Sequence, residues 1–382
     1  MLLKNGEFYL NHSFIQADLR IRDGRIDSYG ELAAEPSEEV IDLAGSRVIP
    51  GFFDIHTHGA YGTDVNAATP EKLEKICRFF ASQGTTSWLG SVLTDTEEAT
   101  CRAIDAFLGW QKLPHHGAVM EGIHLEGPFL SKDYKGAMPE KLLRMPDLDL
   151  IRRYQERAEG NIRYITVAPE LPGVISMIPK LKEMGIQVAI GHSGASYETS
   201  MEAIRAGAMA STHTGNGMKL LHQHFPSIFG AALESQDLYC EMICDGRHLH
   251  PATVRIIIKA KGLDRVVAVT DSIMAAGLPD GRYKLGVNDV VVEKGDAKLA
   301  SDGTRAGSTL TTGQALRNLR RFTQFSLAEL VPVLTENPAK LIGLDQRIGT
   351  INPGKEANLL VLKNGHVAKT MVHGQFVYEE AQ

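Results

Sequence analysis

The stretch Pro50-Gly51-Phe52-Phe53-Asp54-Ile55-His56-Thr57-His58-Gly59 places two histidines two residues apart at the end of a short apolar run. Side chains alternate along a β-strand, so the run predicts a strand with both imidazoles on one face. Two imidazoles at a strand end, followed by the glycine-bearing loop 59–62, can form one side of a transition-metal site. Two ordinary half-buried histidines would give the same pattern, so the interpretation depends on the partners that the rest of the chain supplies.

The composition narrows the class of protein. The chain has 382 residues, of which 43% are hydrophobic and 23% charged, as in a globular protein with one large domain or two. A net charge of −6 gives no electrostatic reason to expect nucleic acid or an anionic membrane as a partner. The first residues lack the apolar core of a signal peptide, and no stretch is long enough to span a bilayer. Four cysteines without a CxxC pair do not make a disulfide framework, so we expect a cytoplasmic protein.

Both ends of the chain are predicted to be rich in β-structure. Asp23-Gly24 marks a hairpin turn near the start, and Asn364-Gly365 and His373-Gly374 mark two turns between short apolar runs near the end. Neither end is large enough to be stable alone. We therefore expect the two ends to pair into one small sheet domain beside the middle of the chain.

The middle of the chain alternates between apolar strands and helices. The expected strands are 51–57, 86–92, 120–126, 163–168, 187–191, 209–213, 238–243 and 266–271. The helices between them include 70–83, 147–158, 174–184 and 197–206, of which the first has Thr69 as N-cap and Pro70 at its first position. Eight strand–helix units over roughly 300 residues are typical of a (β/α)8 barrel, with a doubly wound open sheet as the alternative.

Polar side chains at the strand ends favour the barrel. Five of the later strands lead into motifs that carry titratable side chains. These motifs are His124-Leu125-Glu126, Gly191-His192-Ser193, Thr212-His213-Thr214, Asp245-Gly246-Arg247-His248 and Thr270-Asp271-Ser272. Each one alone has an ordinary structural explanation, such as a cap or a hydrogen bond to the backbone. A closed barrel brings all of these strand ends to one rim, whereas an open sheet would scatter them.

Together these motifs resemble the amidohydrolase superfamily, and within it the N-acetylglucosamine-6-phosphate deacetylases. The tail segments 336–340 and 349–359 resemble the closing segment of that superfamily, so the resemblance runs nearly from end to end. It implies a (β/α)8 TIM barrel over residues 49–348, with a small β-sandwich domain formed by residues 1–48 and 349–382. It also implies a homodimer that removes the acetyl group from an N-acetylhexosamine 6-phosphate, of the glucosamine or galactosamine type, in amino-sugar catabolism.

The resemblance further implies a metal centre with a catalytic aspartate beside it. The ligands it implies are His56, His58, Glu126, His192 and His213, and the aspartate is Asp271. A mixture of imidazole and carboxylate suits zinc or iron, and the HxH pair favours two ions over one. A bound ion lowers the pKa of water and polarises the amide carbonyl. Asp271 is then expected to act first as general base and then as general acid.

The substrate side departs from the resembling deacetylases. Lys135-Gly136-Ala137-Met138 stands where they have Lys-Gly-Ala-His, and His224-Phe225-Pro226-Ser227 where they have Arg-Glu-Pro-Gly. A thioether donates no hydrogen bond, and histidine binds phosphate more weakly than a guanidinium. Arg305, Arg247 and Lys219 are the candidates to replace that guanidinium, with solvated surface charges as the alternative explanation. The expected substrate contacts are Ala137, Met138, Asn216, Gly217, His224, Arg247, His248, Arg305, Ala306 and Gly307.

Two other functions stay open at the level of sequence. The same chemistry could act on an unphosphorylated N-acyl sugar or another small amide, because the usual histidine and arginine are missing. A paralogue with a structural or regulatory function is the other alternative. The complete set of metal ligands and the aspartate favours catalysis.

Overall fold

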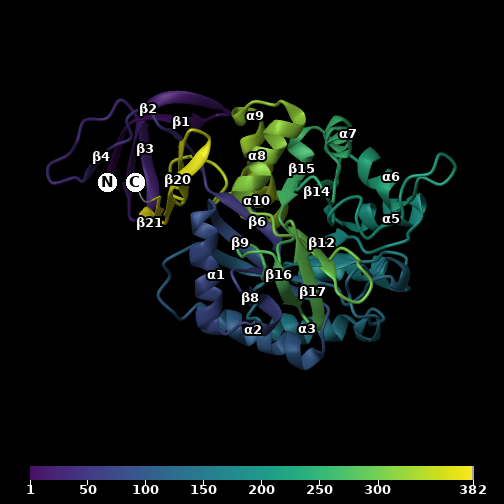
Figure 1. The fold of residues 1–382 in the computed structure, drawn as a ribbon. Helices are drawn as coiled ribbons and strands as arrows, with labels where there is room; N and C mark the ends of the chain where they lie inside the picture. Colours follow the sequence, from purple (N-terminus) through teal and green to yellow (C-terminus); the bar gives the residue numbers. More distant parts are fainter. Residues whose placement is uncertain (381–382) are drawn as a thin grey trace.

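Eight parallel strands form the centre of the molecule in the computed structural model, which describes residues 1–380 (Figure 1). They are β6 (Phe52–Thr57), β9 (Thr85–Leu93), β10 (Val119–Glu126), β11 (Ile162–Val167), β12 (Gln187–Ile190), β13 (Ala210–Ser211), β14 (Tyr239–Ile243) and β15 (Val266–Val269). Each strand pairs with the next in this order. All eight predicted strands are confirmed, with ends that differ by one to a few residues.

The ends of β6 and β15 meet and close the sheet. Thr57 and Ser272 form a parallel bridge. The amide of Asp271 donates a hydrogen bond to the carbonyl of His56, and the amide of His58 donates one to the carbonyl of Ser272, both at 2.8 Å. The predicted barrel is therefore confirmed, and the alternative of an open, doubly wound sheet is wrong.

The buried side chain of Asp54 strengthens this seam from below. Its carboxylate accepts hydrogen bonds from the hydroxyl of Thr270 at 2.5 Å, from the amide of Thr270 at 3.3 Å and from the amide of His56 at 3.3 Å. Burial raises the pKa of Asp54 to about 6 in spite of these bonds. The two donors of Thr270 on this buried carboxyl group tie β6 to the end of β15.

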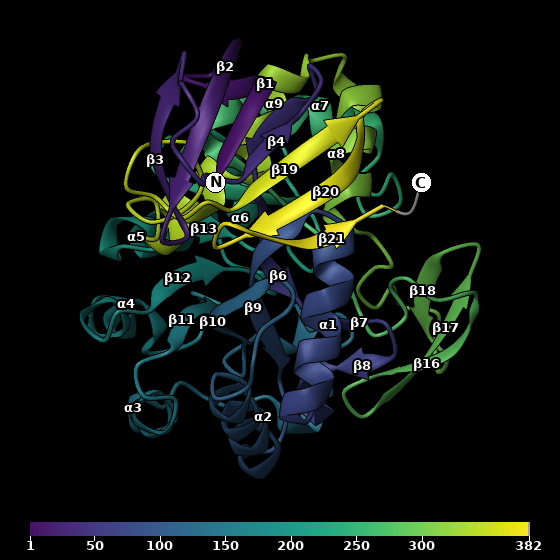
Figure 2. The ribbon, with the colours of Figure 1, turned by 90° about the vertical axis from the view of Figure 1, so that its left-hand side faces the viewer.

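Helices follow the barrel strands and cover the outside of the barrel (Figures 1 and 2). They are α1 (Pro70–Ser82), α2 (Glu97–Trp110), α3 (Leu148–Arg157), α4 (Val174–Glu183), α5 (Tyr197–Ala206), α6 (Ser227–Glu234), α7 (Pro251–Lys261) and α8 (Thr312–Thr323), followed by α9 (Leu327–Leu334) and α10 (Glu336–Ile342). Thr69 caps α1 as predicted, because its side chain accepts a hydrogen bond from the amide of Lys72. Within residues 1–380, no helix combines the length and the apolar character needed to cross a membrane.

The two ends of the chain form one eight-stranded sheet beside the barrel (Figure 2). Its strands are β1 (Leu2–Leu10), β2 (Ser13–Arg22), β3 (Arg25–Gly30), β4 (Val40–Asp42), β5 (Arg47–Pro50), β19 (Leu359–Lys363), β20 (His366–Val372) and β21 (Gln375–Glu379). The antiparallel pairing of β5 with β19 joins the two ends, as predicted. This sheet has an apolar cluster of its own, which includes Phe8, Leu19 and Met371. Residues 381–382 of the expected C-terminal segment lie outside the described part of the chain.

A three-stranded sheet that the sequence reading missed lies between β15 and α8. It consists of β16 (Gly281–Leu285), β17 (Asn288–Glu293) and β18 (Asp296–Leu299), and it projects beside the barrel in Figure 2. Its inner side chains pack with Leu93 and Met138 in a separate apolar cluster. Another small ribbon, β7 (Gly59–Ala60) with β8 (Thr63–Asp64), forms the glycine-bearing loop after the HxH motif.

We expect Glu38→Gln to lower the melting temperature at pH 7 by a few degrees, through loss of an ion pair in the terminal sheet. The carboxylate of Glu38 lies 2.9 Å from Nε and 3.0 Å from Nη2 of Arg20. This hydrogen-bonded pairing with Arg20 lowers the pKa of Glu38 to about 2. A lowered pKa stabilises the fold above the ordinary value of about 4.5 and loses that contribution as the pH falls toward 2. The difference from wild type should therefore shrink between pH 5 and pH 2 in thermal melts followed by circular dichroism.

Glu39→Gln is the matched control, because the exposed side chain of Glu39 has no ion pair within the described residues. If Glu38→Gln lowered the melting temperature by the same amount at every pH, the ion pair with Arg20 would not be the cause of the loss of stability.

Candidate metal centre

Six buried side chains converge at the carboxyl end of the barrel in two groups of three. The first group is His56, His58 and Asp271, and the second is Glu126, His192 and His213. Within each group the potential ligand atoms lie no more than 4.8 Å apart. The structure therefore brings together the five expected ligands and the expected aspartate.

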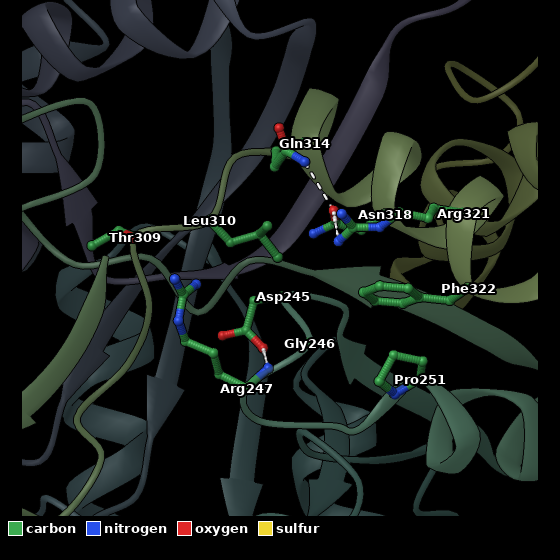
Figure 3. Close-up of a pocket in the computed structure, with 10 residues that line it drawn as sticks. All are labelled: Asp245, Gly246, Arg247, Pro251, Thr309, Leu310, Gln314, Asn318, Arg321 and Phe322. Carbon is green, nitrogen blue, oxygen red and sulfur yellow. Dashed lines mark hydrogen bonds between the residues drawn. The ribbon is translucent and has the colours of Figure 1, made fainter. Parts of the chain in front are cut away.

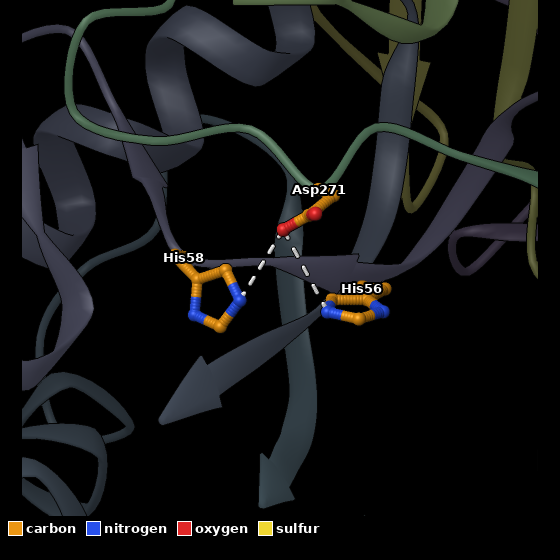
Figure 4. A group of neighbouring side chains, drawn as sticks. All are labelled: His56, His58 and Asp271. Atoms are coloured by element: carbon orange, nitrogen blue, oxygen red, sulfur yellow. Dashed lines mark ion pairs between the residues drawn. The ribbon is translucent and has the colours of Figure 1, made fainter. Parts of the chain in front are cut away.

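The closed seam of the barrel places Asp271 against the two histidines of the HxH motif. Oδ1 of Asp271 lies 3.3 Å from Nε2 of His58 and 3.8 Å from Nε2 of His56, so one carboxylate oxygen faces both rings (Figure 4). The hydrogen bond from His58 and the nearby charges of both histidines lower the pKa of Asp271 against the opposing effect of burial. Asp271 is therefore a carboxylate at neutral pH, as a general base must be.

Glu126 lies between the two groups. Its Oε1 is 3.1 Å from Nε2 of His192 and 3.2 Å from Nε2 of His213. Its Oε2 is 3.0 Å from Nε2 of His58. A carboxylate with one oxygen directed to each group has the geometry to be shared between two ions.

All four imidazoles present the same nitrogen to the centre, because the other nitrogen is already engaged. Nδ1 faces the backbone carbonyl of Ser91 in His58 (3.1 Å), of Tyr134 in His192 (2.8 Å) and of Asn216 in His213 (3.1 Å), and a carboxylate oxygen of Glu241 in His56 (3.0 Å). These oxygens can only accept, so each Nδ1 carries a proton, and in the neutral ring that a metal requires each Nε2 points a lone pair inward.

These lone pairs have no donor to meet them. Nε2 of His192 and Nε2 of His213 are 3.0 Å apart, and Nε2 of His56 is fully buried without a hydrogen-bond partner. Two ring nitrogens this close repel one another unless a proton or a metal ion lies between them. The facing carboxylates of Glu126 and Asp271 outweigh burial and raise the pKa of His58 to about 9, which also shows that the centre attracts positive charge. The donor set fits a divalent metal.

Glu241, in the middle of β14, is a functional residue that the sequence reading missed. Its side chain is fully buried and accepts hydrogen bonds from Nδ1 of His56 (3.0 Å), from the hydroxyl of Tyr164 (2.6 Å) and from the amide of His213 (3.0 Å). It therefore orients the ring of His56 and fixes the backbone at His213, one residue from each group. The available signal was an acidic residue inside an otherwise apolar strand, 239–243.

Three of the converging residues have backbone angles in the left-handed region. The φ angle is 46° at His192, 28° at His213 and 48° at Asp271. Such angles are unfavourable for these residue types and are concentrated at functional sites. The glycine at position 217 is required for a related reason, because a Cβ there would lie 2.9 Å from Nδ1 of His192.

A cavity of about 210 Å³ opens above the centre. Most of the expected substrate contacts line it: Ala137, Met138, Asn216, Gly217, His248, Arg305 and Gly307. Three of the expected contacts do not line it. Ala306 is buried in the apolar cluster beneath β16–β18, His224 is exposed on a loop, and the Nη2 of Arg247 donates to the carbonyl of Lys294.

The wall of the cavity nearest to β16 is apolar. Leu93, Met138 and Leu285 line the cavity and belong to one buried cluster, and Met138 is only 2% exposed. The methionine therefore packs under the three-stranded sheet, where an imidazole would need a polar partner. Leu93 and Leu285 are lining residues that the sequence reading did not identify.

Comparison with known proteins agrees with this geometry. The family model described as "Amidohydrolase family" matches residues 47–377. The chain belongs to the amidohydrolase family. This amidohydrolase is 35% identical over 369 residues to N-acetylglucosamine-6-phosphate deacetylase of Bacillus subtilis, a match that covers 94% of this chain and 93% of the relative. It is 33% identical over 358 residues to N-acetylgalactosamine-6-phosphate deacetylase of Escherichia coli O157:H7, with coverage of 94% and 93%.

Solved structures show the same architecture. N-acetylglucosamine-6-phosphate deacetylase of Pasteurella multocida superposes with a TM-score of 0.92 at 29% identity, covering 98% of each chain. An alanine mutant of the Mycobacterium smegmatis enzyme, in complex with N-acetyl-D-glucosamine-6-phosphate, superposes with a TM-score of 0.91 at 31% identity, covering 99% of each chain.

We expect Glu241→Gln to weaken metal binding by about 10- to 100-fold, because the amide group can present a donor to Nδ1 of His56 and disfavour the tautomer that points a lone pair inward. The measurement is metal content after dialysis against a competing chelator, with circular dichroism to verify folding. Tyr164→Phe is the control, since it removes one hydrogen bond to Glu241 but leaves the carboxylate facing His56. Equal metal retention by Glu241→Gln and wild type would show that Glu241 does not orient the ligand.

Proposed function

We propose that this amidohydrolase removes the acetyl group from N-acetylglucosamine 6-phosphate, giving the amino sugar phosphate and acetate. The observation that carries the proposal is the position of the Asp271 carboxylate beside inward-facing imidazole lone pairs, at the floor of a cavity of small-molecule size. The activities by which the similar proteins are named, sugar-phosphate deacetylation in each case, support the substrate class.

The ligand geometry supports two divalent ions, zinc or iron. Glu126, His192 and His213 hold one ion in this proposal, and His56 and His58 hold the other, with Oε2 of Glu126 on the same side. When bound, such ions polarise the amide carbonyl and increase the acidity of water.

Asp271 moves the proton in this mechanism. Its carboxylate takes a proton from the water that attacks the acetyl carbon, and it gives that proton to the sugar nitrogen as the carbon–nitrogen bond breaks. The amide of Asp271 is bonded to the carbonyl of His56, so the backbone holds the carboxylate in place throughout.

Arg305 is the candidate ligand for the substrate phosphate. Among the described residues it is the one arginine or lysine that lines the cavity. Its Nε and Nη2 bind the carboxylate of Asp296 at 2.9 and 3.1 Å, which lowers the pKa of Asp296 to about 2. We propose that Arg305 and His248 contact the phosphate. The existing pairing with Asp296 favours, as a second candidate, a sugar without phosphate.

We further propose that the enzyme acts in the cytoplasm as a homodimer, as the resemblance in sequence implies. Leu220, Leu221 and Phe225 support a contact between two copies, since they lie on one loop and are 53% to 68% exposed. Sedimentation of the enzyme as a monomer at micromolar concentration would contradict the dimer.

The proposed function is tested by measuring acetate release from N-acetylglucosamine, N-acetylgalactosamine and their 6-phosphates. We expect N-acetylglucosamine 6-phosphate to have the highest kcat/KM. Asp271→Asn should lower kcat by about 10²- to 10⁴-fold, because the amide cannot take the proton, and should leave metal content unchanged. Equal turnover of N-acetylglucosamine and its 6-phosphate would contradict the proposal that the substrate is phosphorylated. A near wild-type kcat for Asp271→Asn would show that Asp271 does not transfer the proton.

Arg305→Met should raise the KM for N-acetylglucosamine 6-phosphate about tenfold with little change in kcat, because binding of the phosphate is remote from the reacting amide. Lys298→Met is the matched control, since Lys298 also pairs with Asp296, at 3.1 Å, but does not line the cavity. The same KM for both variants would argue against a contact between Arg305 and the phosphate.

A further inference from the structure

A second cavity, of about 510 Å³, lies beside the loop that follows β14 (Figure 3). Asp245, Gly246 and Arg247 form one side of it, and Gln314, Asn318 and Arg321 of α8 form the other. Pro251, Leu310 and Phe322 add apolar surface to the lining. None of these residues lines the cavity above the metal centre, so the two cavities are distinct.

The charge around this second cavity is positive in a chain whose net charge is −6. Arg247 and Arg321 reach it from opposite sides (Figure 3). Within residues 1–380, no carboxylate lies within 4.0 Å of either guanidinium. Behind the lining, Arg317 donates to Oε1 of Gln314 at 2.7 Å and Arg255 donates to the carbonyl of Phe322 at 2.7 Å, and these two also lack a carboxylate partner among the described residues.

The one carboxylate in the lining, that of Asp245, already accepts hydrogen bonds from its own turn. Oδ1 of Asp245 accepts from the amides of Arg247 and His248 at 2.7 and 2.8 Å, and Oδ2 accepts from Nδ1 of His248 at 2.7 Å. These bonds lower the pKa of Asp245 although burial opposes them. Its charge is therefore used within its own turn and is not paired with the guanidinium of Arg247 or of Arg321.

The polar wall of α8 is held in a fixed arrangement that leaves donors available. Asn318 is 5% exposed, and its Oδ1 accepts from Nε2 of Gln314 at 2.8 Å and from Nη2 of Arg321 at 3.3 Å. Within residues 1–380 the guanidinium of Arg321 makes this one hydrogen bond, so its other N–H groups can bind a ligand.

From these observations we infer that the second cavity is a binding site for a small phosphorylated molecule, distinct from the catalytic site. Two guanidiniums on opposite sides match a phosphate dianion, since each can bind a different pair of oxygens. The apolar part of the lining matches the carbon skeleton of an organic phosphate, and the volume is that of an ordinary small-molecule site. The class of ligand is therefore a phosphate ester or the free phosphate ion.

The site is connected to the catalytic cavity through one turn. His248 lines the catalytic cavity and is held by Asp245, and Nη1 of Arg305 donates to the carbonyl of Arg247 at 3.2 Å. A ligand that moves the side chain of Arg247 also displaces the backbone of residues 245–248. This segment carries His248 and the carbonyl to which Arg305 donates. We expect occupancy to change the KM for the substrate and to leave kcat unchanged.

The test is calorimetric titration of the metal-loaded enzyme with glucose 6-phosphate, which has no amide to hydrolyse, and separately with inorganic phosphate. We expect Arg321→Gln to bind one molecule fewer per chain than wild type, or to bind it at least tenfold more weakly. Arg320→Gln is the matched control, because it removes the same charge from the neighbouring position, which lines a different groove. Arg321→Lys should give an intermediate affinity, because it retains the charge without the planar fork.

The outcomes distinguish an organic phosphate from the free phosphate ion, and the second cavity from the catalytic cavity. Tighter binding of glucose 6-phosphate assigns the site to an organic phosphate, and equal binding of inorganic phosphate assigns it to the free ion. Equal binding by Arg321→Gln and wild type, or an equal loss in Arg320→Gln, would overturn the inference. Because binding is read directly, a failure of the proposed deacetylase activity would leave this result intact. A folded Arg321→Gln protein is recognised by an unchanged melting temperature and an unchanged kcat.

Discussion

Two backbone hydrogen bonds across the barrel seam determine where the chemistry of this protein takes place. The amide of Asp271 donates to the carbonyl of His56, and the amide of His58 donates to the carbonyl of Ser272. The bonds that close the barrel are therefore the bonds that set the aspartate against the two imidazoles. Closure of the barrel and placement of the group His56, His58 and Asp271 thus depend on the same contacts, and Asp54 supports both from just below the strand ends.

The centre also places several ionisable side chains in the buried interior of the barrel. Carboxylates and imidazoles without water are costly unless each has a partner. The buried carboxylate of Glu241 is stabilised by three hydrogen-bond donors, which come from three different strands or strand ends. Glu126 and the inward lone pairs have no such donors, so their charge is left for a cation. The difference between these two glutamates distinguishes a residue that orients ligands from one that is a ligand.

The barrel and the converging residues could be predicted because their signals are local. Apolar runs mark the strands, and a titratable residue at a strand end must lie on the common rim of a barrel. Glu241 was missed because its partners come from β6, β11 and the turn after β13, so its role depends on contacts between segments far apart in sequence. The sheet β16–β18 was missed because its strands are short and half exposed, which leaves little apolar periodicity. The positions of His224 and Arg247 depend on the course of loops, which alignment with a motif does not define.

The segment that contains β16–β18 supplies part of the cavity rim but none of the metal ligands. It enters the chain after β15, when every residue of the metal centre has already been supplied by the barrel, and the segment 281–307 then brings Leu285 and Arg305 to the rim of the cavity. Insertions or charge changes in this segment can alter which molecules enter without disturbing the ligands below. One part of the cavity rim is thus encoded apart from the metal ligands, so this part can change in evolution while the ligands are retained.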